Sequence, residues 1–368
     1  MRGHRDQITA IRFLSTNESQ PSSSTTAASG LLLTSSKDTF VKLWDLTTHH
    51  CIQTLVGHRS EIWSLDVSPG KDFLFSGGGE GEVKAWRIDK EAVQEGLKAN
   101  DAGEVCSYSH ETSLDSTDVA QVVKMIHPIT NLPLGSQHRV TQIAFHPKQP
   151  YIAFQSHERS IEIFRIRSDE EVKKKMARRR KRAKEKKLEQ AGKKGKLEEA
   201  DADVEMEEEE IPFIDKFAPH VVVRASGKVR SFDFAIEPPS QKSIIQLFVA
   251  LSNNSMEVYS IPQPAKSSDA PPEATRTHSV HLPGHRADIR SLCLSSDDRI
   301  LASAANGSLK IWNMKTTACI RTMECPHPVS STFLPGDRHV RIQLYQQLRI
   351  NHSLNAYRSL LGQRPAKF

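Results

Sequence analysis

The sequence predicts an all-β protein built from repeated small antiparallel sheets. An apolar strand, a polar turn and a second strand ending in tryptophan occur three times, at Trp44, Trp86 and Trp312. The same plan occurs twice more without the tryptophan, over 140–164 and 229–259. Apolar and polar side chains alternate within these segments, which is the period of a strand with one buried face. Repeats of this kind indicate a radial array in which each repeat supplies one four-stranded sheet.

Recurring polar residues accompany the three tryptophan copies, and a Gly-His pair precedes each copy. The pattern resembles the WD40 repeat, so we expect a WD40 β-propeller, incomplete at about five to six blades. The resemblance implies a buried hydrogen-bond chain in each blade, formed by the histidine, a hydroxyl group, a turn residue and the tryptophan. The residues assigned to these chains are His4, Thr34, Asp38 and Trp44, then His58, Ser76, Glu80 and Trp86, and finally His285, Asn306 and Trp312.

These polar residues are interpreted as structural cross-links, because they recur once per blade. Buried polar groups must be paired, and a fully paired network makes the sheet rigid. The alternative, that the histidines and carboxylates are ligands or catalysts, does not explain this recurrence. The two copies without tryptophan are degenerate. The first carries His138, Glu158 and Phe164 at the corresponding positions, and the second keeps almost none of the cross-linking residues.

Composition limits the class of protein. The chain has 368 residues, 37% hydrophobic and 26% charged, which is enough to bury a sizeable core. No apolar run approaches the length of a membrane span, and the polar N-terminus does not resemble a signal peptide. The five cysteines have no paired spacing, which favours reduced thiols in an intracellular compartment. We expect no cofactor, no metal and no membrane partner, and Cys325-Pro326-His327 is too sparse for a zinc site.

The charged segment 167–219 interrupts the repeats. From Lys173 to Lys196 it holds fourteen Lys or Arg against two Glu, a net charge of +12, whereas the whole chain is +6. An acidic run follows at 198–210. The stretch 172–188 has strong helix formers and no Pro or Gly, so we expect a helical or disordered insertion. The residues assigned to nucleic-acid contact or nuclear import are Lys173, Lys174, Lys175, Arg178, Arg179, Arg180, Lys181, Arg182, Lys184, Lys186 and Lys187. A solvated charged helix without a partner remains an alternative.

The expected organisation has four parts. Residues 1–166 form blades one to three, with an insertion at 89–137. Residues 167–219 are the charged insertion, a basic helix followed by the acidic run. Residues 220–338 form further blades, and 339–368 are a tail without repeats.

Several unusual strings give a narrower resemblance. The segments 34–46, 57–65, 77–86, 151–157, 177–186 and 222–228 are similar to the WD repeat-containing protein three family. That resemblance implies a subunit of the UTP-B subcomplex of the small-subunit processome, which is built around U3 small nucleolar RNA. It implies 18S pre-ribosomal RNA processing, location in the nucleus and nucleolus, and other UTP-B subunits, U3 RNA and pre-ribosomal RNA as partners. The family has two tandem propellers and a helical C-terminal region, so we expect a truncated form with part of the first propeller.

The resulting prediction is a non-catalytic scaffold without a small-molecule substrate. An enzyme is disfavoured because Gly77-Gly78-Gly79-Glu80-Gly81 lacks the Lys-Ser/Thr of a phosphate-binding loop. The alternative is a generic interaction adaptor such as a ubiquitin-ligase substrate receptor. Those propellers often carry Trp-Asp-x-Arg, which none of the three tryptophan copies matches.

Overall fold

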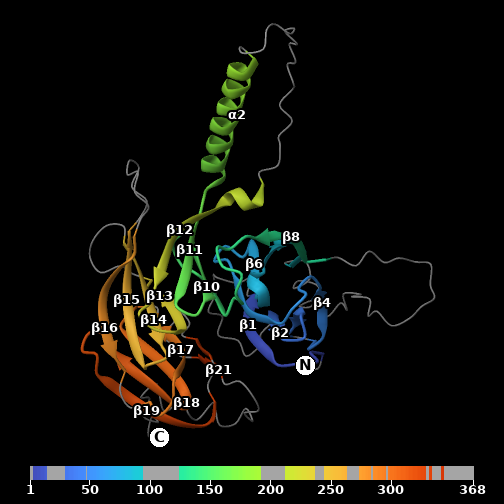
Figure 1. Cartoon of the computed structure of the whole chain (residues 1–368). Helices are drawn as coiled ribbons and strands as arrows, with labels where there is room; N and C mark the ends of the chain where they lie inside the picture. The colour runs from blue at the N-terminus through green and yellow to red at the C-terminus, as the bar shows by residue number, and fades with distance from the viewer. Residues whose placement is uncertain are drawn as a thin grey trace, which may run out of the picture.

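The computed structural model describes residues 3–14, 30–46, 48–93, 124–191, 212–236, 244–262, 273–282, 285–295, 297–328, 331–333 and 341–343. Five antiparallel sheets succeed one another around a common centre as the blades of a β-propeller, and a long helix projects from them (Figure 1). The expected all-β propeller is confirmed.

Each blade uses consecutive strands, and the first strand lies at one edge of its sheet. Blade one contains β1 (Ile8–Leu14), β2 (Leu31–Ser36), β3 (Val41–Asp45) and β4 (Cys51–Leu55). Blade two contains β5 (Ile62–Val67), β6 (Phe73–Gly78), β7 (Val83–Ile88) and β8 (Ile126–Leu132), with the short helix η1 (Gly79–Gly81) between β6 and β7. Blade three contains β9 (Gln142–Phe145), β10 (Tyr151–His157), β11 (Ser160–Ile166) and β12 (Phe217–Arg224). Blade four contains β13 (Val229–Phe234), β14 (Ile244–Leu251), β15 (Ser255–Pro262) and β16 (Thr275–His281).

Blade five contains β17 (Ile289–Leu294), β18 (Ile300–Asn313) and β19 (Cys319–Pro328). Although β18 is one continuous element, Ser303 and Trp312 within it are hydrogen-bonded at 2.8 Å. Nine residues of straight strand would separate them by roughly 30 Å. Therefore β18 doubles back, and the turn lies at Gly307, whose φ of +83° suits glycine. Its two halves pair with β17 and β19, which makes this sheet four-stranded in effect.

Three strands lie inside ranges that the sequence analysis assigned to an insertion or tail. Strand β8 pairs with β7 and falls within 89–137, and β12 begins inside 167–219. A short pair, β20 (Ser331–Phe333) and β21 (Arg341–Gln343), reaches into 339–368. The sequence pattern did not predict β8, because Pro128 interrupts its ladder with β7 and several of its side chains are exposed. An outermost strand therefore need not show clean apolar alternation.

The core lies in the seams between blades. One apolar cluster joins blades one and two through Leu33, Leu43, Leu65 and Trp86. The clusters between blades two and three, three and four, and four and five follow the same arrangement. Burial of these sheet faces removes apolar area from water and supplies most of the stabilisation.

Polar side chains fasten the innermost strands of neighbouring blades. Asp66 accepts hydrogen bonds from Arg12 Nε at 2.7 Å and from the Phe145 amide at 2.8 Å, so it links three blades. Gln142 donates to the Phe232 carbonyl at 2.7 Å and accepts from its amide at 3.1 Å. Asp233 accepts from the Leu294 amide at 2.9 Å. Each seam thus has directional contacts in addition to apolar packing.

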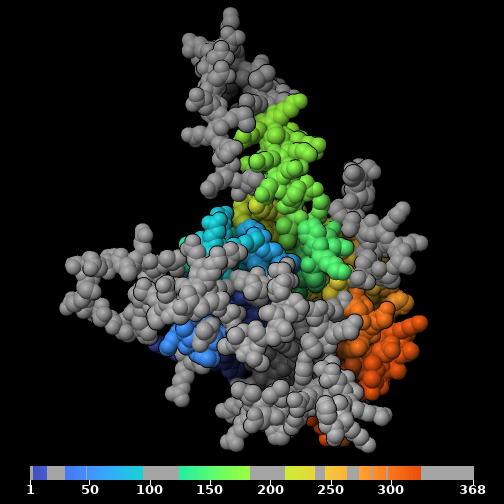
Figure 2. All heavy atoms as spheres, turned by 180° about the vertical axis from the view of Figure 1, so that it is seen from behind, coloured from blue at the N-terminus to red at the C-terminus, as the bar shows by residue number. Residues whose placement is uncertain are grey.

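Helix α2 (Asp169–Ala191) is inserted between β11 and β12 of blade three and projects away from the blades (Figure 1, Figure 2). Three acidic residues in its first turn, Asp169, Glu170 and Glu171, complement the positive end of the helix dipole. Ser168 Oγ accepts the Glu171 amide hydrogen bond at 3.3 Å as an N-cap. Across the described ranges no helix combines the length and apolar character needed to cross a membrane.

Candidate functional site

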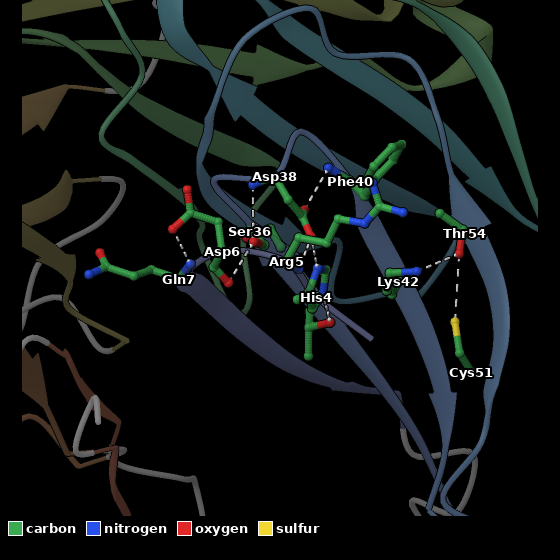
Figure 3. A network of polar contacts seen from close by, with 12 residues as sticks. His4, Arg5, Asp6, Gln7, Ser36, Asp38, Phe40, Lys42, Cys51 and Thr54 are labelled. Carbon is green, nitrogen blue, oxygen red and sulfur yellow. Dashed lines mark hydrogen bonds and ion pairs between the residues drawn. The ribbon is translucent and has the colours of Figure 1, made fainter. Parts of the chain in front are cut away.

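The polar chain of blade one holds the four expected residues together, and Figure 3 shows its His4 beside Asp38. Trp44 Nε1 donates to Thr34 Oγ1 at 2.7 Å, and Thr34 Oγ1 lies 2.7 Å from His4 Nε2. His4 Nδ1 lies 2.7 Å from Asp38 Oδ2, an acceptor, which assigns the proton to Nδ1. Burial lowers the pKa of His4 despite this carboxylate. Burial would raise the pKa of Asp38, but hydrogen bonds from the amides of Arg5 and Phe40 and from His4 lower it instead.

In blade two the carboxylate beside the histidine is Glu82, and the assignment of Glu80 to this position was wrong. His58 Nε2 lies 2.6 Å from Ser76 Oγ, which accepts from Trp86 Nε1 at 2.8 Å. Glu82 Oε2 lies 3.3 Å from His58 Nδ1, whereas Glu80 is exposed in η1 with a φ of +59°. Burial lowers the pKa of His58 to about 4. The imidazole is therefore neutral near pH 7.

In blade five the turn residue is Ser308, and the assignment of Asn306 was also wrong. His285 lies 2.7 Å from Ser303 Oγ through Nε2 and 2.8 Å from Ser308 Oγ through Nδ1. Trp312 Nε1 donates to Ser303. Asn306 is exposed at the turn of β18, two residues away. Burial lowers the pKa of His285 to about 4, so this imidazole is also neutral near pH 7.

Blades three and four each replace the polar chain with a buried glutamate that the repeat pattern did not predict. Glu162 accepts from Ser156 Oγ at 2.6 Å and from the Gly135 amide at 2.9 Å. Glu257 accepts from Ser226 Oγ at 2.7 Å and from Arg276 at 2.8 Å.

A register signal could have identified both glutamates. They lie two residues before the position of the blade tryptophan, where the other blades carry lysine. Those lysines, Lys42, Lys84 and Lys310, donate toward the fourth strand of their own blade. A change from lysine to glutamate at this position therefore accompanies the loss of the histidine chain. Of the residues assigned to the first copy without tryptophan, Glu158 instead forms an exposed ion pair with Lys228, in the segment 225–228 between blades three and four.

The basic residues gather on α2. The exposed basic residues of this helix include Lys173, Lys174, Arg178, Arg179, Arg180, Lys181 and Arg182. Lys175 is 3.1 Å from Asp215, which ties it to the base of the helix. Lys184, Lys186 and Lys187 belong to the same helix, and their side chains lie outside the described residues. No Asp or Glu occurs between Lys173 and Arg182, so this stretch is a concentrated positive surface.

The base of α2 is tied to the propeller. Val172 is fully buried, and Lys216 lies 2.7 Å from Asp169. Arg165 lies 2.8 Å from Glu171 in the first turn. Beyond the helix, Phe213 in η2 (Phe213–Lys216) packs edge-on against Phe73 of blade two, with ring centroids 4.9 Å apart. These contacts fix the direction in which the helix leaves blade three.

The described histidines of blades one, two and five lie inside the polar chains of their own blades. Within the described ranges, no group of three or more His, Cys, Asp or Glu side chains is placed to hold a metal ion. A projecting cationic helix can neutralise phosphates without any bound cofactor.

Comparison with known proteins agrees with this architecture. The family described as "WD domain, G-beta repeat" matches residues 1–45, 49–87 and 276–313. U3 small nucleolar RNA-associated protein 12 of Saccharomyces cerevisiae is 33% identical over 305 residues, which are 83% of this chain and 28% of the yeast protein. WD repeat-containing protein 3 of Mus musculus is 41% identical over 120 residues, 33% of this chain and 12% of that protein. Its Homo sapiens counterpart is 39% identical over 130 residues, 33% and 13% of the two chains.

The fold, the polar chains and these matches define a WD40-repeat β-propeller protein. Within that class, the chain belongs to the family of WD repeat-containing protein 3 and U3 small nucleolar RNA-associated protein 12. It spans 28% of the length of the yeast relative.

Proposed function

We propose that this chain is a non-catalytic scaffold in nucleolar biogenesis of the small ribosomal subunit. The propeller would present surfaces to other UTP-B and processome proteins, and α2 would contact U3 RNA or pre-ribosomal RNA during 18S processing. The name of the yeast relative supports the association with U3 RNA. The observation that carries the proposal for this chain is α2, a fixed, exposed helix whose basic residues are uninterrupted by acidic ones between Lys173 and Arg182.

Physical chemistry supports RNA as the partner of this helix. Each phosphate neutralised by Lys or Arg releases condensed counterions, which gives affinity without sequence readout and with strong salt dependence. Arginine matches phosphate with paired donors, and Arg178, Arg179, Arg180 and Arg182 are within one ten-residue stretch. The same stretch is also a basic cluster of the kind that directs nuclear import.

The decisive experiment neutralises Arg178, Arg179, Arg180, Lys181 and Arg182 together as glutamines. We expect loss of RNA crosslinking and of nucleolar accumulation, and loss of U3 RNA from affinity purifications of the chain. A matched control neutralises five exposed arginines of the propeller, Arg59, Arg87, Arg159, Arg286 and Arg290. Retention of crosslinking and nucleolar location by the α2 variant would remove the assignment, and equal loss in both variants would reduce it to net charge.

A further inference from the structure

We propose that α2 inserts between RNA segments and contacts phosphates on opposite sides, instead of lying along one RNA surface. This inference rests on the proposed function, because it specifies the RNA that the same helix would bind. The ligand class is folded RNA in which backbones converge, as at a helical junction.

The positive charge of α2 is distributed around most of the helix. At about 100° per residue, the eight basic residues between Lys173 and Arg182 spread around roughly three quarters of the circumference. The remaining sector holds Met176, which is only half-buried and follows the buried Val172 by one turn. A helix that binds a single surface would concentrate its cations on one side and place apolar or acidic residues on the other.

The basic side chains of α2 are also accessible to a ligand. From Lys173 to Arg182 each basic residue is exposed, over about three quarters of the helix circumference. Helix α2 extends about 35 Å at 1.5 Å per residue, and it projects from the blades instead of packing along them (Figure 1). Phosphates can therefore approach opposite sides of the helix at the same level.

Contacts at its base hold α2 in a fixed direction. Buried Val172, the ion pairs of Asp169 and Lys175, and the Phe213–Phe73 contact hold the base of the helix. A preorganised helix loses less conformational entropy on binding than a flexible basic tail does. A one-sided contact would leave about half of the cations without phosphate partners, so their mutual repulsion would remain.

The test uses the full chain, a three-way-junction RNA and two matched triple variants. One variant changes Lys173, Arg180 and Lys181 to Gln, and these residues centre on one side of the helix. The other changes Arg178, Arg179 and Arg182 to Gln, and these residues centre on the opposite side. Both remove three charges and introduce a residue with good helix propensity, and circular dichroism checks that the helix is retained. Fluorescence anisotropy measures affinity from low to moderate salt.

We expect each triple variant to reduce the slope of log affinity against log salt by about 2–3, because each lost phosphate contact removes about 0.7–0.9. A reduction in only one variant would overturn the inference while leaving RNA binding by α2 intact. A plain duplex should give a shallower slope than the junction, and equal slopes would also overturn it. If the wild-type chain binds polyglutamate as tightly as RNA, or if neither triple variant changes RNA binding, the proposed function itself fails.

Discussion

In blade four the hydroxyl of Tyr259 donates a hydrogen bond of 2.7 Å to Glu257, two residues earlier on the same strand. Side chains two apart on a strand share a face, and Tyr259 stands at the strand position that tryptophan occupies in blade one. Burial raises the pKa of Tyr259, and the neighbouring Glu257 raises it further. The tyrosine is therefore a neutral donor to a charged acceptor.

Replacement of Glu257 by Gln should lower the free energy of unfolding by about 2–3 kcal/mol, because Tyr259, Ser226 and Arg276 lose a charged acceptor. Urea unfolding measures this change. Glu158→Gln is the control, since its ion pair with Lys228 is exposed and we expect no measurable change in stability. Equal losses in the two variants would contradict the assignment of a network to Glu257.

The two glutamates of the blade-two turn should differ in their contribution to stability. Glu82→Ala removes the carboxylate beside His58 and the 2.9 Å ion pair with Lys84, so we expect a loss of about 1 kcal/mol. Glu80→Ala should change stability by less than about 0.5 kcal/mol, because Glu80 is exposed. Thermal unfolding of both variants tests this order, and a larger effect at Glu80 would restore the residue that the repeat pattern indicated.

In blade five, Ser308→Ala should destabilise the chain by about 1 kcal/mol, since His285 Nδ1 loses its partner inside the blade. Asn306→Ala, at the exposed turn, should have an effect below about 0.5 kcal/mol. Because the indole of Trp312 belongs to the same network, its near-ultraviolet circular dichroism should change in the Ser308 variant and stay constant in the Asn306 variant.

The carboxyl group of Asp233 makes the stability of the folded chain depend on pH. Burial raises the pKa of Asp233 to about 7, although the Leu294 and Phe234 amides oppose the shift. Between the ordinary value of about 4 and this value, the folded chain keeps a proton that the unfolded chain releases, so stability falls as pH rises. His58 and His285 act in the opposite direction. Their lowered pKa values make stability rise with pH from about 4 to about 6.5.

Asp233→Asn removes the first effect and keeps both histidines. Its free energy of unfolding relative to wild type should therefore increase from pH 4.5 to pH 7, by up to about 1.4 kcal/mol per pH unit. Urea titrations at several pH values measure the difference. A difference that stays constant over this range would show that Asp233 is ionised in the folded chain already at low pH.

Much of the propeller could be predicted because its apolar strands repeat and three tryptophans mark their ends. The positions of the turn acceptors could not, because the turns differ in backbone conformation. The turns before β3 and β7 both have four residues, but the η1 conformation leaves Glu80 exposed and places Glu82 beside His58. The tight turn of β18 brings Ser308 to His285. The outer strands β8 and β12 could not be predicted for a different reason. They follow long segments of low apolar content, so periodicity alone could not separate them from insertions.

Strands β11 and β12 pair directly beneath α2, with Ile166 opposite Phe217. Their hairpin is closed by its own ladder, so the fifty residues between them are an appendage that the sheet does not need for continuity. Loop-closure entropy grows only slowly with length. The arm can therefore change in length beyond the contacts of Val172 and Phe213 while the pairing of β11 with β12 stays the same, an arrangement that separates the choice of ligand from strand pairing.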